Sequence, residues 1–210
     1  IARIAEQAAQ RPKLETAEQV MASIVPPARD IALPPPVQGS ERTQLFAWDK
    51  HNAGKPQHLA KLINLALHDL MAQYPNTVLC GEDIGKKGGV YHVTQDLFEA
   101  FGPNRVINTL LDEQSILGLA IGMAQQGLIP IPEIQFLAYV HNAEDQIRGE
   151  AATLSFFSNG QYTNPMVIRI AGLAYQRGFG GHFHNDNSFA VFRDIPGVIV
   201  VCPSNGRDGV

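Results

Sequence analysis

The sequence predicts an α/β fold: a doubly wound, mostly parallel sheet with helices on both faces. From about residue 55 onward, short apolar segments alternate with segments of helical apolar spacing. That alternation is typical of a parallel sheet covered on both sides. Apolar residues make up 45% of the 210-residue chain and charged residues 17%, a balance typical of a protein with a sizeable core.

The composition of the first part of the chain indicates an arm that lies outside the core. Residues 1–10 are alanine-rich with helical spacing, and Thr16 and Gln19 resemble a capping box. Prolines between residues 26 and 39 indicate an extended connector. We therefore assign residues 1–54 to a helical, proline-rich linker arm and residues 55–210 to one α/β domain. Phe46 and Trp48 of the arm are expected to pack onto that domain.

The pattern within the domain predicts each element in turn. We expect helices over residues 59–71, 94–101, 113–126 and 137–157. We expect strands over residues 77–80, 106–107, 129–136, 165–170 and 198–202. His58 and His68 in the first of these helices have no partner at metal-ligand spacing, so surface or capping roles are expected for both.

Composition and charge exclude several classes of partner. The net charge is −4 and no run of Lys and Arg occurs, so nothing points to a nucleic-acid partner. No signal peptide or apolar run of membrane-spanning length is present. Cys80 and Cys202 each lie in an apolar run, which predicts core residues of a reducing, cytoplasmic compartment. Because the chain begins with Ile1 and stops where a new helix is announced, we expect a piece of a longer protein.

Glu113 is the first candidate functional residue. It stands at the start of a helix, where the helix dipole favours a carboxylate. Apolar neighbours are expected to exclude water and disfavour the charge, namely Leu110, Leu111, Ile116 and Leu117. Opposed influences of this kind can tune a carboxyl group for proton transfer. An acidic residue in a first turn is also an ordinary helix start, and spacing alone does not separate the two readings.

Three polar segments fall where strands are expected to end. They are the helix start at Glu113, residues 135–139, and the loop that carries His182 and His184. Ligands of open α/β sheets bind beyond the carboxyl ends of the strands. We therefore expect these segments to converge on one site.

A series of short motifs then occurs in fixed order along residues 77–210. They are Gly81-Glu82-Asp83-Ile84-Gly85, Gly88-Gly89-Val90, Val93-Thr94, Leu111-Asp112-Glu113, Gly118, Gly122-Met123-Ala124, Glu133-Ile134-Gln135-Phe136, Asp145-Gln146-Ile147, His184 and Pro196-Gly197. The series resembles the beta subunit, or beta half, of the thiamine-diphosphate-dependent 2-oxo acid dehydrogenases, over the transketolase-like domain that holds the cofactor's pyrimidine ring. The arm resembles the join in members that fuse the alpha and beta halves.

The resemblance implies roles for five residues. Glu113 matches the catalytic glutamate that hydrogen-bonds the aminopyrimidine ring and so helps the cofactor lose its thiazolium proton. Leu111, Gln135 and Tyr139 match positions that hold the ring, although Tyr139 also suits ordinary packing. His184 matches a catalytic histidine near the thiazolium and the substrate, which is implicated in acyl transfer to the lipoyl carrier. His182 and His184 lack a third ligand for a metal site.

The sequence also departs from the family pattern. Residues 185–187 are Asn-Asp-Asn, where relatives more often carry Ser-Gln-Ser, which leaves the substrate preference open. The family's Gly-Asp-Gly motif for Mg²⁺ and the diphosphate does not occur in these 210 residues. The resemblance thus implies that an alpha-type diphosphate-binding domain or chain holds Mg²⁺. We expect the chain alone neither to bind thiamine diphosphate tightly nor to turn over.

The implied function is oxidative decarboxylation of pyruvate or a branched-chain 2-oxo acid, with acyl transfer to lipoamide. Implied partners are the alpha-type domain and a lipoyl acyltransferase component, in a homodimer or heterotetramer. Gly118 and Gly122 allow another helix to approach closely, or pack against the chain's own sheet. A transketolase-like or deoxyxylulose-phosphate-synthase-like enzyme, and a non-catalytic assembly domain, are the alternatives that the sequence leaves open.

Overall fold

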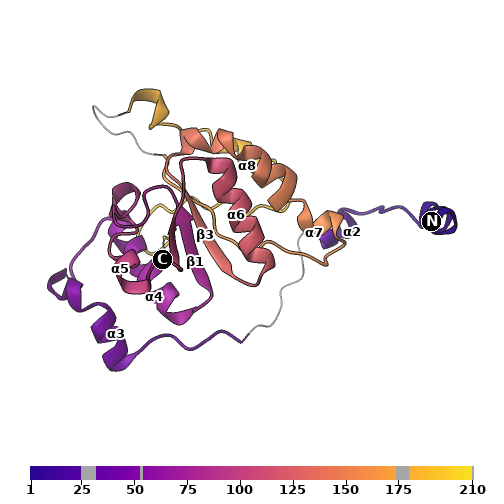
Figure 1. The fold of residues 1–210 in the computed structure, drawn as a ribbon. Coiled ribbons are helices and arrows are strands. Elements are labelled where there is room, and N and C mark those ends of the chain that lie inside the picture. The colour runs from indigo at the N-terminus through magenta and orange to yellow at the C-terminus, as the bar shows by residue number, and fades with distance from the viewer. Residues whose placement is uncertain (25–31, 53, 174–179, 210) are drawn as a thin grey trace.

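The computed structural model describes residues 1–24, 32–52, 54–173 and 180–209 (Figure 1). The strands are β1 (Thr77–Gly81), β2 (Val106–Asn108), β3 (Ile129–Ile134) and β4 (Arg169–Ile170). The α-helices are α1 (Ala2–Ala9), α2 (Ala17–Ile24), α3 (Gly39–Leu45), α4 (Leu59–Gln73), α5 (Leu97–Phe101), α6 (Glu113–Gln125), α7 (Leu154–Phe157) and α8 (Ala190–Arg193). Tighter or wider single turns are η1 (Ala47–Asn52), η2 (Val90–His92), η3 (Leu137–Asn142), η4 (Gln146–Ala151) and η5 (Gly181–Phe183).

The four strands form one parallel sheet in the order β2-β1-β3-β4. Side chains of a strand alternate between the two faces of its sheet, and successive residues of β1 enter different cores. Leu79 packs with Leu67 and Met71 of α4, whereas Cys80 packs with Ile116 and Leu117 of α6. Helices therefore cover both faces, and the predicted α/β class is confirmed.

The helix predicted over residues 137–157 is wrong as a continuous element. The structure breaks it into the 3₁₀ segment η3, the π-helical segment η4 and the short helix α7. Ala143, which follows η3, has a φ of −124° and a ψ of 10°, outside the helical range. This break allows the side chains of η3 to reach the site described below.

The strand predicted over residues 198–202 is also wrong. The segment has no strand partner among the described residues, and Ile199 and Val201 are 90% and 69% exposed. Cys202 is exposed as well, so it is not the core residue that its apolar neighbours predicted. Cys80 is buried, and burial raises the pKa of its thiol to about 12. The predicted strands over residues 129–136 and 165–170 are present but shorter, as β3 and β4.

Part of the arm packs on the domain, as the aromatic residues predicted. The Trp48 ring lies 5.2 Å from the His68 ring of α4, measured between centroids, and Lys61 Nζ of α4 lies 3.8 Å above Trp48. Farther toward the N-terminus, α1 buries no residue and stands apart from the sheet (Figure 1). The predicted capping box of α2 is present, because Gln19 N donates to Thr16 Oγ1 at 3.3 Å and Thr16 N to Gln19 Oε1 at 3.2 Å. Part of the proline-rich connector lies outside the described residues.

Two buried polar residues of α4 were not predicted to face the core. His58 caps the helix by accepting a hydrogen bond from Lys61 N, as expected. His68 is 1% exposed and so takes neither a surface nor a capping role. Asn64, also 1% exposed, donates to the carbonyl oxygens of Val93 and Gln95 at 3.0 Å each. These bonds fix the loop after β1, in which the Thr94 hydroxyl donates to Ile84 O instead of capping a helix.

Candidate active site

Glu113 is the first residue of α6 and is 7% exposed. Ile116 and Leu117 of the same helix, exposed to 2% and 1%, form the apolar floor beneath this helix start. Leu110 and Leu111, expected to cover Glu113, are instead 86% and 69% exposed. Most of the Glu113 side chain is therefore shielded from water, and the preceding leucines face outward.

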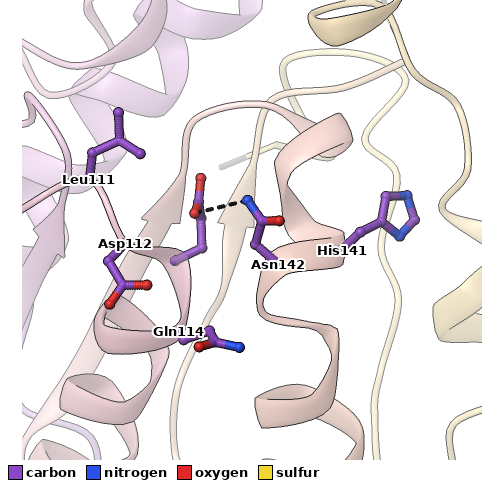
Figure 2. A pocket seen from close by; sticks show the side chains of 6 residues that line it. Leu111, Asp112, Gln114, His141 and Asn142 are labelled. Carbon is purple, nitrogen blue, oxygen red and sulfur yellow. Dashed lines mark hydrogen bonds between the residues drawn. The ribbon is translucent and has the colours of Figure 1, made fainter.

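A side chain from η3 binds the Glu113 carboxylate. Asn142 Nδ2 donates to Glu113 Oε2 at 3.2 Å (Figure 2). Among the residues that the structure describes, the hydrogen bond to Glu113 goes to Oε2 and not to the other oxygen, Oε1. A pocket of about 540 Å³ lies over this carboxylate, within the usual range for small-molecule sites. It is lined by Leu111, Asp112, Glu113, Gln114, His141 and Asn142.

A second carboxylate lies within electrostatic reach of Glu113. Glu82 follows the last residue of β1 and is half-buried. Burial raises the pKa of the Glu82 carboxyl group, and the charges of Asp83 and Glu113 raise it further, while Lys87 acts in the opposite direction. The carboxyl end of the sheet thus brings two acidic groups together, an arrangement found where proteins handle protons.

His184 lies in an aromatic cluster on the other side of η3. Its Nε2 lies 3.0 Å from Tyr139 Oη, and its ring centroid lies 4.6 Å from that of Phe136. Its Nδ1 lies 3.2 Å from Gly180 O. A carbonyl oxygen only accepts, so the hydrogen-bond network assigns the proton to Nδ1 and leaves Nε2 to accept from the Tyr139 hydroxyl. The ring is thereby held in one tautomer and one orientation.

Tyr91 extends this cluster from a strained loop. Its ring lies edge-on to Phe136, with centroids 6.3 Å apart. Tyr91 and His92 have φ values of 54° and 58°, in the left-handed region that residues other than glycine rarely adopt. Buried Glu133 accepts from Val90 N at 3.4 Å and is ion-paired with Arg169. These contacts hold the loop in its strained conformation beside the site.

The structure distributes the predicted site residues over two neighbouring subsites. Glu113 and Leu111 line the pocket, whereas Tyr139 and His184 meet in the aromatic cluster. Gln135 is half-buried at the end of β3 and does not line the pocket. His182 is exposed and lies against Phe183, and no group of three or more metal-ligating side chains occurs among the described residues.

Sequence reasoning missed Asn142 and His141, both of which line the pocket. They lie inside what the sequence predicts to be one long helix, where consecutive residues carry no special signal. Only the break after η3 places Asn142 opposite α6. Nothing in the local pattern announces that break, so neither residue was identifiable from spacing.

Comparison with known proteins supports the same part of the fold. Residues 55–209 match the family model described as the transketolase pyrimidine-binding domain. The chain is 41% identical over 157 residues to the mitochondrial 2-oxoisovalerate dehydrogenase subunit beta 2 of Arabidopsis thaliana, covering 74% of this chain and 43% of the relative. It is 37% identical over 155 residues to the pyruvate dehydrogenase E1 component subunit beta of Staphylococcus aureus strain MW2, covering 71% and 46%.

A third relative is the 2-oxoisovalerate dehydrogenase subunit beta of Bacillus subtilis, 39% identical over 147 residues, which are 70% of this chain and 44% of that protein. The chain therefore belongs to the transketolase pyrimidine-binding domain family, and it is similar to beta subunits of 2-oxo acid dehydrogenases. It spans less than half the length of these curated relatives. No helix in the described part of the chain is long and apolar enough to cross a membrane.

Proposed function

We propose that this chain supplies the pyrimidine-binding half of a thiamine-diphosphate-dependent 2-oxo acid dehydrogenase. The observation that carries the proposal is the buried Glu113 carboxylate, which is anchored through Oε2 and faces a pocket with Oε1 available. Such an oxygen can accept a hydrogen bond from a ring N–H of an aminopyrimidine, and this bond is strong where little water is present. The family match and the dehydrogenase names of the relatives support the same assignment.

The residues around the pocket fit a flat, partly apolar heterocycle. The exposed Leu111 side chain lies at the mouth of the pocket, where a bound ring would cover it and remove its apolar surface from water. Gln135 and Tyr139 complete the proposed set of pyrimidine-binding residues. When bound, the cofactor supplies the nucleophilic carbon and the electron sink for decarboxylation.

Two residues of this chain have proposed proton-handling roles. Glu113 would hold the ring nitrogen of the aminopyrimidine by a hydrogen bond and would stabilise the protonated form of that ring. His184 is held by Tyr139 and Gly180 and would lie near the substrate, where a histidine of fixed tautomer suits proton transfer during acyl transfer. Thiamine diphosphate would be shared with an alpha-type partner that holds Mg²⁺ and the diphosphate. A lipoyl acyltransferase would then accept the acyl group.

Glu113→Gln in the full-length protein, assembled with its alpha-type partner, tests this proposal. The substitution keeps the shape of the side chain and removes the charge that would stabilise the protonated ring. We expect exchange of the thiazolium C2 proton with deuterated solvent to slow by about 10²–10⁴-fold, the usual contribution of acid–base catalysis. Glu99→Gln, an exposed change on α5, is the matched control and should leave the exchange rate unchanged.

Calorimetry with thiamine diphosphate and Mg²⁺ accompanies the exchange measurement. Wild-type exchange in a cofactor-loaded Glu113→Gln protein would reject the role of Glu113. Failure of the wild-type assembly to bind the cofactor would reject the function as a whole. Turnover assays with pyruvate and with branched-chain 2-oxo acids then decide between the two substrate classes that the relatives' names suggest.

A further inference from the structure

His141 connects η3 to the loop that carries His184. In Figure 2 the His141 ring leaves η3 on the side away from Asn142 and from the Glu113 carboxylate. There its Nε2 lies 3.2 Å from Ser188 Oγ and 3.7 Å from Asp186 Oδ2. Adjacent residues of η3 thus contact two different parts of the site.

The loop side of this contact is organised by Asp186. Its Oδ1 accepts from Ser188 N at 2.7 Å and from Ser188 Oγ at 2.5 Å. Because the Ser188 hydroxyl gives its proton to Asp186, its oxygen accepts from His141 Nε2–H. The hydroxyl is therefore not aligned to give its proton to His141, and Ser188 is not arranged as an activated nucleophile. The contact is structural in character.

The other nitrogen of His141 lies farther from its neighbour. Nδ1 is 3.4 Å from Glu144 Oε2, and because a neutral imidazole donates from one nitrogen only, the shorter contact from Nε2 to Ser188 Oγ is the one assigned the proton. The His141 side chain is 44% exposed and that of Asp186 24%. A half-exposed side chain with partners on both sides suits a contact that holds two surface segments together.

Tyr139 and His141 together determine where the loop lies. Tyr139 contacts His184, and His141 contacts Ser188, so two residues of η3 hold the loop at two points. Asn142 of the same segment binds Glu113. Any shift of η3 therefore moves the partners of both proposed proton-handling groups.

We infer that His141 is a positioning residue: with Asp186 and Ser188 it forms a latch that holds the loop of residues 181–188 on η3 and so keeps His184 at its place relative to Glu113. The effect of the latch on catalysis rests on the proposed function. The contact between the loop and η3 rests on the observed distances alone. Asp186 belongs to residues 185–187, where this sequence departs from the family pattern, and Ser188 follows directly, so the latch includes a residue particular to this chain.

The test compares His141→Phe with His141→Gln in the full-length assembled protein. Phenylalanine fills similar space without a donor, whereas the glutamine amide can still donate to Ser188. Hydrogen exchange of the backbone amides of residues 181–188, measured without cofactor or substrate, should be about tenfold faster in His141→Phe, which is the loss expected for one hydrogen bond. In His141→Gln it should return to within about twofold of wild type.

Ser188→Ala removes the same contact from the loop side. It provides a second test if His141→Phe folds poorly. It should accelerate exchange at least as much as His141→Phe does, because it also removes the bond from Ser188 Oγ to Asp186, and the double variant should be no worse than Ser188→Ala alone, because both changes remove the His141–Ser188 contact. Additive effects, or unchanged exchange in both single variants, would overturn the latch. Equal acceleration in His141→Phe and His141→Gln would also overturn it.

The catalytic consequence is measured separately. In single turnovers, His141→Phe should slow acyl transfer to lipoamide about tenfold, with His141→Gln restoring most of the rate, as the fold-changes in loop protection predict. If loop exchange behaves as expected but the assembly binds no thiamine diphosphate, the latch stands and the proposed function falls. If the cofactor binds but loop exchange is the same in the variants as in wild type, the latch is rejected and the proposed function stands.

Discussion

At the scale of single residues, the site depends on how two carboxyl groups share one small region. Glu82 follows the end of β1 and Glu113 begins α6, and the charge of Glu113 makes ionisation of Glu82 less favourable. Asn142 donates a hydrogen bond to the Glu113 carboxylate. Glu82 has no such donor among the described residues, and burial and its acidic neighbours raise its pKa.

The raised pKa of Glu82 predicts how stability depends on pH. The folded protein keeps this proton to a higher pH than the unfolded chain, whose ordinary value is 4.5. Stability is therefore lost as the pH rises from below 4.5 through the raised pKa. Glu82→Gln carries no charge and should be more stable than wild type at pH 7 by about 0.5 kcal/mol, a small figure because solvent screens a half-buried group.

Urea unfolding at several pH values checks this prediction, with Glu99→Gln as the exposed control. The advantage of Glu82→Gln should disappear below about pH 4, where the unfolded carboxyl group is also protonated. A gain of the same size at pH 4 and pH 7 would show that packing, and not charge, explains it.

The sequence predicted where some candidate residues lie but not the side chains that contact them. Glu113 begins a helix as predicted, and the predicted residues Tyr139 and His184 lie in contact, while their roles stay predictions. Leu111 lines the pocket although it is exposed. Asn142 and His141 were missed because their roles depend on a break between η3 and η4 that tertiary contacts decide.

At the scale of elements, the errors of prediction share one cause. The pattern of apolar residues along the chain does not show which other segments each element contacts. The apolar run at residues 198–202 has the composition of a strand but pairs with nothing in the described structure, and strand propensity depends on such context. Conversely, α4 buries Asn64 and His68 because the loop at residues 93–95 and the arm cover them. The sequence of α4 alone contains neither of these neighbours.

The packing of the arm on α4 depends on His68 in its neutral form. The rings of Phe46, Trp48 and Phe101 lie within 6.1 Å of the His68 ring, measured between centroids. Its Nδ1 lies 2.9 Å from Asn64 O, and its Nε2 has no hydrogen-bond partner within the described part of the chain. Burial lowers the pKa of His68, and the Asn64 bond opposes this; Lys61 also lowers it, whereas Asp96 and Asp69 raise it.

Because the pKa of His68 is lowered, acid should loosen the arm. The contact is fully stable above the ordinary value of 6.5 and weakens as the pH falls from there through the lowered pKa. Trp48 is the chain's single tryptophan, so its fluorescence reports this contact. We expect its emission to shift to longer wavelength as the pH falls from 7 to 5.

His68→Asn should remove this pH dependence, and His58→Asn, at the exposed end of α4, should preserve it. The arm makes further contacts through the ion pairs Arg42–Asp69 and Lys61–Asp49, so the emission change should precede global unfolding. An emission that stays constant in wild type down to pH 5 would contradict the role of His68.

At the scale of the whole molecule, α6 packs against the sheet with one face and leaves its outer face exposed. Gly118 and Gly122 lie on α6 and are exposed, and a Cβ atom at either would meet nothing within 4 Å. Within the described residues they therefore do not pack closely against the chain's own sheet. We propose that they allow a second helix, from a partner domain, to approach closely.

Opposite effects on stability and on association test this role. Gly118→Leu should raise the stability of the chain by about 0.5–1 kcal/mol, because glycine is a poor helix residue and the space is open. The same change should weaken association with the alpha-type partner at least tenfold, since a bulky side chain prevents two helices from approaching closely. Ala100→Leu, an exposed small-to-large change on α5, is the matched control. Thermal unfolding of the chain and sedimentation of the mixture measure the two quantities, and undiminished association of Gly118→Leu would place the partner on another face.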